Sequence, residues 1–347
     1  MDAEPFVYEG GTVPPGETEH VRFPVSETYL GDPVTTPVTV VVGEQPGPTV
    51  FLTAAVHGDE LNGVEVVREV AQEWDHEEVC GTLLCLPVVN TLGFVAQERY
   101  LPVQDRDLNR AFPGKSGSTS AKRIAHRVYE QFLSKCDFGL DFHTSTRGRT
   151  NMFHVRADMS DDEVARLARS FGTNVIIDTE GSEGMLRHEL TAAGVPTITV
   201  EMGQAHRFER PLIDRALSGV ESVFAEYDVY PDREVQWPGW RTVVSGWDEK
   251  TWLRADVGGI VEVHADRGDL VHEGDRICTI TNPFKTEKTV VTAPFTGIVV
   301  GLLANPVVYP GNPLCHLVSV ETDVRDAVQL HRTDPATPAG GLPADDE

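Results

Sequence analysis

The sequence is poor in basic residues. Of its 347 residues, 54 are acidic and 29 are basic, which gives a formal net charge of −25 at pH 7, and only six of the basic residues are lysine. Binding to the phosphates of a nucleic acid needs a positive field. We therefore expect no nucleic-acid partner.

Paired cysteines and long apolar runs are also missing. The five cysteines do not form the CxxC pairs of a structural zinc site, so we expect buried or partly buried free thiols. No run of about 18 apolar residues occurs. The acidic start MDAEPFVYEG lacks the basic segment and apolar run of a signal peptide. These absences predict no membrane partner and a cytoplasmic location.

Acidic residues are in excess along the whole chain rather than in one run. This distribution is similar to that of proteins from extreme halophiles. An ordinary acidic surface is the alternative, and solubility and folding measured against salt concentration distinguish the two.

Strand-like and helix-like segments alternate through the first two thirds of the chain. β-Branched and apolar runs bounded by Gly and Pro predict strands at residues 38–42, 49–56, 81–89, 138–142, 174–178 and 197–201. Helical character falls at residues 62–74, 121–133, 161–170 and 211–227. This order predicts an α/β layered domain with a mixed, largely parallel sheet over residues 1–235.

The composition changes around Trp237-Pro238-Gly239-Trp240. From residue 241 onward, short β-rich runs are separated by glycine turns, which predicts a small all-β sandwich or barrel over residues 241–322. Residues 332–347 are rich in Pro, Ala, Gly and Asp and predict a disordered acidic tail.

The glycine rhythm of residues 258–317 resembles that of the lipoyl/biotinyl-type β fold. That fold carries its prosthetic group on a hairpin lysine, and Lys285 and Lys288 lie in the central connection, NPFKTEKT. Neither lysine stands in the Met-Lys-Met or Asp-Lys setting that such attachment uses. We expect an unmodified structural domain that shapes the mouth of the site or builds a homo-oligomer.

Three apolar runs of the first domain end in residues that can bind a metal or transfer a proton. The first ends in His57-x-x-Glu60, the second in His143 and the third in Glu201. Open α/β sheets bind ligands at the carboxyl ends of their strands, and catalytic zinc takes three protein ligands. A lone His after a strand is more often a hydrogen-bonded structural residue, but three such strand ends together predict a metal site.

A fourth segment reads Asp107-Leu108-Asn109-Arg110. An Asn-Arg pair is suited to gripping a carboxylate, because a guanidinium binds it through two parallel hydrogen bonds and the amide adds a donor. Taken alone, this tetrapeptide is better explained as a surface turn with a salt bridge.

In order and spacing, these segments resemble the zinc carboxypeptidase clan, specifically its aspartoacylase and succinylglutamate desuccinylase branch. The phrases AAVHGDELNG, DLNRAFPG, DFHTSTRG and TVEMG carry the resemblance, which spans about residues 40–225. It implies a zinc carboxypeptidase-like three-layer domain with one Zn²⁺ per chain on His57, Glu60 and His143, and with Asp107 orienting His57.

The same resemblance implies the chemistry. Glu201 takes a proton from the zinc-bound water and delivers it to the leaving amine, Arg99 supplies positive charge near the developing oxyanion, and Asn109 and Arg110 hold a substrate carboxylate. The implied reaction is hydrolysis of the amide bond of a small-molecule N-acyl amino acid, of acetyl or succinyl type, to a carboxylate and a free amine. A zinc carboxypeptidase acting on peptides and a non-catalytic metal-binding protein of the same fold are the alternatives.

The resemblance is weaker at the position where the family has an arginine that binds a second substrate carboxylate. Arg187 lies nearest before the Glu201 strand but does not align cleanly. Arg147, which we take as a candidate substrate contact, and Arg149 are the alternatives. Solvent-exposed loop arginines explain both equally well.

Other polar residues of this half have simpler explanations. His154, His188 and His206 lack a ligand-like neighbour at suitable spacing, so we expect them to be pocket or surface residues. Asp59 lies between two predicted ligands and is expected to support them or to cap the backbone.

Overall fold

The computed structural model describes residues 3–244, 250–284 and 286–320. The predicted tail at 332–347 and Lys285 lie outside these residues. The described parts contain α1 (Asn62–Glu73), α2 (Thr91–Ala96), α3 (Ser120–Gln131), α4 (Asp162–Ser170), α5 (Leu186–Ala192) and α6 (Arg210–Glu226), with short 3-10 helices η1 (His76–Glu78), η2 (Leu108–Arg110) and η3 (Leu133–Lys135).

Ten strands precede the change in composition that the sequence shows near residue 237. They are β1 (Phe6–Tyr8), β2 (Gly11–Val13), β3 (Thr18–Glu27), β4 (Pro33–Val42), β5 (Gln45–Ala54), β6 (Cys80–Leu86), β7 (Phe138–Ser145), β8 (Arg149–Ala157), β9 (Val175–Asp178) and β10 (Thr197–Gln204).

Nine further strands follow it. They are β11 (Thr242–Val244), β12 (Lys250–Arg254), β13 (Gly259–Val263), β14 (Leu270–Val271), β15 (Arg276–Thr281), β16 (Lys288–Thr292), β17 (Gly297–Leu303), β18 (Val307–Val308) and β19 (Pro313–Ser319).

The main sheet has the strand order β12-β19-β17-β8-β10-β7-β5-β6-β4-β3. Its centre is parallel, because β5 pairs in parallel with β6 and β7, and β7 pairs in parallel with β10. The flanking pairs β3 with β4, β4 with β6, and β8 with β10 are antiparallel. The predicted mixed sheet is therefore confirmed.

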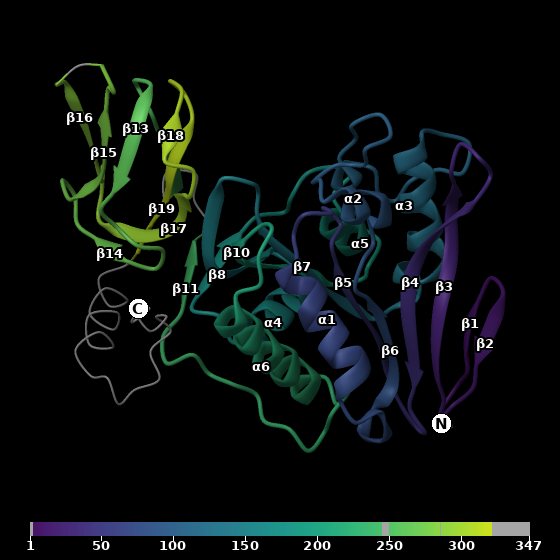
Figure 1. Cartoon of the computed structure of the whole chain (residues 1–347). Coiled ribbons are helices and arrows are strands. Elements are labelled where there is room, and N and C mark those ends of the chain that lie inside the picture. The colour runs from purple at the N-terminus through teal and green to yellow at the C-terminus, as the bar shows by residue number, and fades with distance from the viewer. Residues whose placement is uncertain (1–2, 245–249, 285, 321–347) are drawn as a thin grey trace.

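Helices cover both faces of this sheet (Figure 1). The core on one face includes Val66, Val67 and Val70 of α1 together with apolar residues of α4 and α6. The core on the other face includes Ile124 of α3 and Leu186 of α5. Two separate apolar cores, one on each face, account for the three-layer arrangement.

The C-terminal strands form antiparallel sheets, which confirms the predicted all-β region. Strands β16, β15, β13 and β18 make a four-stranded sheet, while β17 pairs with β8 and so joins the C-terminal region to the main sheet. Strand β11 also pairs with β9 of the main sheet. The limits 1–235 and 241–322 for the two predicted units stay a prediction.

Two smaller expectations can be compared with the described residues. All five cysteines are free thiols, four of them buried and Cys80 partly buried. No helix within the described ranges is long and apolar enough to cross a membrane.

Helix α1 lies unusually close to β7, and a glycine makes this possible. A Cβ added to Gly63 would lie 2.4 Å from Cβ of Phe142 and 3.2 Å from its carbonyl oxygen. The absence of a side chain at residue 63 brings the start of α1, and with it the preceding loop, against the strand that carries His143.

We predict that Gly63→Ala lowers the free energy of unfolding by about 1–3 kcal/mol, because backbone-anchored neighbours must move to accept the methyl group. This cost outweighs the gain in helix propensity, which is at most about 1 kcal/mol. Urea denaturation measures it. Gly117→Ala is the control, since no atom lies within 4 Å of the added Cβ there; equal stability of the two variants would contradict the packing argument.

Candidate metal centre

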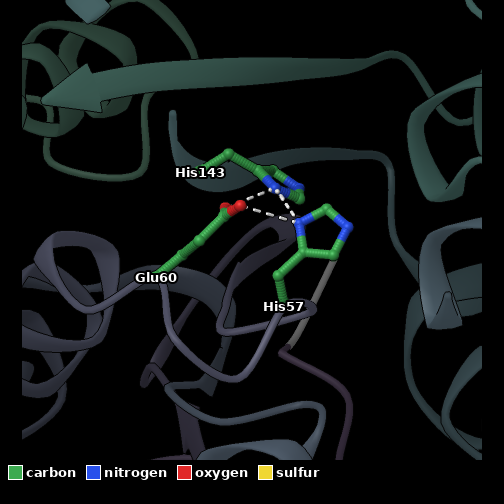
Figure 2. A group of neighbouring side chains, drawn as sticks. All are labelled: His57, Glu60 and His143. Carbon is green, nitrogen blue, oxygen red and sulfur yellow. Dashed lines mark hydrogen bonds and ion pairs between the residues drawn. The ribbon is translucent and has the colours of Figure 1, made fainter. Parts of the chain in front are cut away.

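Three side chains converge where β5 and β7 end. His57 and Glu60 lie in the loop after β5, and His143 lies in β7; β5 and β7 are paired up to Ala54 and Phe142, so their ends lie side by side. Nδ1 of His57 lies 3.0 Å from Oε1 of Glu60, and Nδ1 of His143 lies 2.9 Å from Oε2 (Figure 2). All three side chains are buried.

The far nitrogen of each imidazole is held by a carboxylate. Nε2 of His57 lies 3.2 Å from Oδ1 of Asp107, and Nε2 of His143 lies 2.7 Å from Oδ2 of Asp141. These carboxylates keep the ring proton on Nε2 of a neutral imidazole, so that the Nδ1 lone pair faces inward. Asp141 is in turn fixed by the Thr53 hydroxyl, which donates to it at 2.9 Å.

The donor set fits a cation. The two Nδ1 atoms lie only 3.1 Å apart, and both face the Glu60 carboxylate. Three lone-pair donors at such distances repel one another unless a positive charge lies between them. Two imidazole nitrogens and one carboxylate oxygen are ligands that zinc accepts. Among the described residues, His57, Glu60 and His143 make up a group (the trio) whose ligand atoms lie close enough together to hold one metal ion.

Charged neighbours shift the pKa values of Glu60 and His143. Burial would raise the pKa of Glu60, but the interactions with His57 and His143 hold that pKa well below its ordinary value. Burial would lower the pKa of His143, but Asp141 and Glu60 raise it well above the ordinary value. In each case the opposite charges outweigh desolvation, so the carboxylate stays ionised and the imidazole side of the site attracts a cation or a proton.

Glu60 has two further donors. Nη1 of Arg99 donates to Oε1 at 2.5 Å, and the backbone N–H of Thr144 donates to Oε2 at 3.0 Å. Arg99, predicted to act on the substrate, thus contacts a candidate ligand directly. Its contact with Glu60 holds the carboxylate in one orientation.

Glu201 shares a row of the sheet with His143. In β10 it lies opposite His143 of β7 and opposite His154 of β8. Directly opposed residues point to the same face of a sheet. Glu201 therefore lies on the face that carries the trio, with 14% of its side chain exposed.

The Glu201 carboxylate is held by two residues of β8 that the sequence interpretation missed. Nδ2 of Asn151 donates to Oε2 at 2.9 Å, and Nε of Arg156 donates to Oε1 at 3.0 Å. Neither residue belongs to a recognisable motif. Asp141, also missed, could have been found, because it precedes His143 by two residues and so shares its face of the strand.

The loop after the trio is tied to the end of β10. Nδ2 of Asn62 donates to the carbonyl of Met202 at 2.9 Å, and the N–H of Glu209 donates to Oδ1 of Asn62 at 2.8 Å. This buried amide fixes the distance between the loop that carries Glu60 and the strand that carries Glu201.

The Asp107–Arg110 segment reaches the trio through its first residue. Asp107 accepts the N–H of Asn109 at 2.9 Å while also contacting His57. Oδ1 of Asn109 accepts the N–H of Leu186, which leaves its Nδ2 amide to donate elsewhere. Arg110 is exposed, and its Nη1 donates to the carbonyl of Asn109.

Arg147 and Arg187, two of the arginines considered for binding a second substrate carboxylate, differ in their surroundings. Arg147 is exposed and lies 2.9 Å from Nε2 of His206, which in turn lies 3.6 Å from Asp59. Arg187 is buried and donates to the carbonyls of residues 179 and 180, and burial lowers its pKa to about 10. Nη1 of its guanidinium is thus bound to backbone carbonyls.

The remaining predictions concern residues beside the trio. His154 is fully buried and so is not a surface residue, and Nδ1 of its ring lies 3.0 Å from the carbonyl of Met152. Asp59 holds the backbone N–H of His206 through its carbonyl at 2.9 Å. Burial and the neighbouring Glu60 raise the pKa of the Asp59 carboxyl.

Taken together, two histidines and a glutamate at the strand ends, with a second glutamate in the same row, define a candidate mononuclear metal centre on a three-layer α/β fold. Residues 46–227 match the succinylglutamate desuccinylase/aspartoacylase catalytic domain. The chain belongs to this family, which confirms the predicted family and the predicted enzyme class, a deacylating hydrolase.

Individual relatives agree in fold. The N-alpha-acetyl-L-2,4-diaminobutyric acid deacetylase of Halomonas elongata is 24% identical over 252 residues, which cover 70% of this chain and 73% of that protein. The product-bound ectoine utilization protein EutE of Ruegeria pomeroyi has a TM-score of 0.79 at 22% identity, covering 92% of this chain and 98% of its own. A succinylglutamate desuccinylase from Silicibacter sp. has the same TM-score and coverage at 24% identity.

We predict that Asp141→Asn weakens Zn²⁺ binding about 10- to 100-fold, because the amide no longer fixes the proton on Nε2 of His143. Competition with a chromogenic chelator measures the affinity. Asp214→Asn, which removes a carboxylate from an exposed ion pair with Arg210, is the control. Unchanged affinity in Asp141→Asn would mean that Asp141 does not support a ligand.

Proposed function

We propose that this chain is a zinc-dependent hydrolase that cleaves the amide bond of an N-acyl amino acid to a carboxylate and a free amine. The observation that carries the proposal is the convergence of His57, Glu60 and His143 within 3.1 Å of one another, with Glu201 in the same row of the sheet as His143. Family membership and the deacetylase relative support the reaction class.

In this proposal His57, Glu60 and His143 hold one zinc ion per chain. When bound, zinc would polarise the acyl carbonyl and lower the pKa of a water molecule toward about 7. Asp107 and Asp141 keep the ring protons of the two histidines on Nε2, so that both Nδ1 atoms stay available. Arg99 and the Thr144 N–H orient the Glu60 carboxylate.

Glu201 is the proposed general base. Its carboxylate accepts a proton from the attacking water and later donates that proton to the amine nitrogen as the C–N bond breaks. Asn151 and Arg156 each donate to one of the two carboxylate oxygens, which limits the side chain to one orientation. Once Glu201 has passed the proton to the amine, both of its oxygens can again accept hydrogen bonds from Asn151 and Arg156.

The proposed substrate contacts are Asn109, Arg110, Arg147 and Arg99. Asn109 offers its Nδ2 amide, and Arg110 offers an exposed guanidinium whose Nη1 donates to its neighbour's carbonyl. Arg99 stands beside the centre and would stabilise developing negative charge on the acyl oxygen in addition to holding Glu60. A cytoplasmic location, a salt-adapted surface and a homo-oligomeric assembly stay predictions.

The reaction class is tested by following the release of free amine from a panel of N-acetyl and N-succinyl amino acids and blocked dipeptides. We expect the zinc-loaded protein in high salt to hydrolyse at least one N-acyl amino acid, with activity lost to a chelator and restored by zinc. Hydrolysis of blocked dipeptides alone would instead indicate a carboxypeptidase. If folded, zinc-bound protein releases no amine from any compound of the panel, the proposal is overturned.

Glu201→Gln tests the base. We expect turnover to fall about 10²- to 10⁴-fold while zinc content is unchanged, because the amide cannot accept the proton but leaves the metal ligands in place. Glu226→Gln, which alters the exposed ion pair with Arg166, is the matched control. Turnover that survives in Glu201→Gln would exclude Glu201 as the base.

A further inference from the structure

Arg149 lies on the same face of the sheet as the proposed base. It is the first residue of β8 and precedes Asn151 by two residues, so both side chains leave the strand on one face. Asn151 donates to the Glu201 carboxylate. The side chain of Arg149, one of the alternatives that the sequence offered for binding a second carboxylate, therefore leaves the sheet on the face of the site.

An aromatic residue of the C-terminal region lies along the same row. Asn151 pairs with Gly301 of β17, Gly301 pairs with His316 of β19, and His316 pairs with Trp252 of β12. The rings of Trp252 and His316 are stacked, with centroids 4.7 Å apart and planes 6° apart.

Glycine at 301 lets Trp252 approach the residue that holds the base. A Cβ added to Gly301 would lie 2.9 Å from Oδ1 of Asn151 and 3.5 Å from Cη2 of Trp252. The tip of the indole thus reaches across the glycine toward Asn151. The C-terminal region thereby contributes an aromatic ring near Asn151, the residue that donates to Glu201.

Trp252 also holds Arg149. The guanidinium carbon lies over the indole, 5.3 Å from its centroid, which is a cation–π contact. Within the described residues no carboxylate pairs with Arg149, whereas Arg99 and Arg156 each bind one. Arg149 is half-buried, so a charge-assisted hydrogen bond to it would be stronger than one at the open surface.

Other positive charges surround this position. Burial and then the charges of Arg99 and Arg254 lower the pKa of Arg149. Arg99 contacts Glu60 of the candidate metal centre, and Arg254 ends β12. Arg149 thus interacts with one arginine that contacts the candidate metal centre and with one at the end of a C-terminal strand.

We propose that Arg149, positioned by Trp252, binds a carboxylate on the amine portion of the substrate. The proposal rests on the proposed function, because it assigns a contact within the same site. A guanidinium binds a carboxylate through two parallel hydrogen bonds, and the indole would keep one side of that pair dry. The carboxylate is either the α-carboxylate or one on the side chain.

Two pairs of probes distinguish these sources. N-acetyl-L-alanine and N-acetyl-L-alaninamide differ only in the α-carboxylate, and N-acetyl-L-aspartate and N-acetyl-L-asparagine differ only in the side-chain carboxylate. For each pair, the ratio of kcat/KM for the acid to kcat/KM for the amide measures recognition of that carboxylate. Loss of preference in one pair identifies which carboxylate Arg149 binds.

We expect Arg149→Gln to lower this ratio at least tenfold in one pair, which corresponds to about 1.4 kcal/mol at 25 °C. Arg149→Lys should keep part of the preference, because it keeps the charge. Zinc content should not change. A ratio unaffected in both pairs, or an equal loss of activity on acid and amide, would overturn the assignment and leave Arg149 a structural residue.

Trp252→Leu tests the positioning role. We expect it to lower the same ratio with Arg149 still present, and Trp252→Phe to restore part of it, because the ring face is kept. Trp237→Leu is a matched control, since Trp237 makes the same kind of contact with Arg241, at 4.8 Å, beside α4 and α6. A fall of the same size in Trp237→Leu would contradict a specific role for Trp252.

Failure of the proposed function is distinguishable from failure of this assignment. If the wild-type protein hydrolyses none of the four probes, calorimetric binding of the same probes to zinc-loaded protein replaces turnover. A preference for the acid in binding that is lost in Arg149→Gln would support the carboxylate contact without catalysis. Equal binding by wild type and Arg149→Gln, or no binding by wild type, would overturn it.

Discussion

The site depends on the parallel, in-register pairing of β5, β7 and β10. Parallel strands end at the same edge of a sheet, and here the three strands bring the loop with His57 and Glu60, then His143, then Glu201 to neighbouring positions. Residues separated by more than 140 positions in the chain are thereby held on a buried framework rather than on independent loops. Close approach of α1 at Gly63 and the Asn62 amide fix the remaining freedom of the first loop.

This framework brings several charged groups into a buried space, and each needs a partner there. A buried carboxylate without a partner costs several kcal/mol, on the order of 3–5 when one member of a buried pair is removed. Glu60 is therefore surrounded by two imidazoles, a guanidinium and a backbone N–H, and each imidazole is backed by a second carboxylate. The three carboxylates and two neutral rings have a shortage of positive charge that a divalent cation would correct.

The sequence predicted the positions of residues within single strands better than it predicted which strands pair with one another. His57 and Glu60 follow an apolar run, and His143 and Glu201 lie at the end of one, so all four could be singled out from the sequence. The structure places His143 and Glu201 inside their strands rather than at the ends, because β7 continues to Ser145 and β10 to Gln204. Strand β8 was not predicted, because Asn151, His154 and Arg156 interrupt its apolar pattern with polar side chains.

The polar residues of β8 are explained only by the pairing of this strand with β10 and β17. The contacts of Glu201 with Asn151 and Arg156, and the approach of Trp252, depend on which strands are neighbours. No local periodicity in one sequence contains that information.

The pairing of β17 with β8 brings the C-terminal region beside Asn151, one of the residues that hold Glu201. It extends the main sheet past Glu201, so that Gly301, His316 and Trp252 continue the row of Asn151. Two arginines of β8, Arg149 and Arg156, lie beside this row, and their positive charges oppose the overall charge of −25. Salt screens exposed charges beyond a Debye length of about 8–10 Å but screens half-buried groups much less. In the proposed function, these arginines would allow the site to act on an anion within a strongly acidic protein, and specificity would depend on them rather than on the net charge.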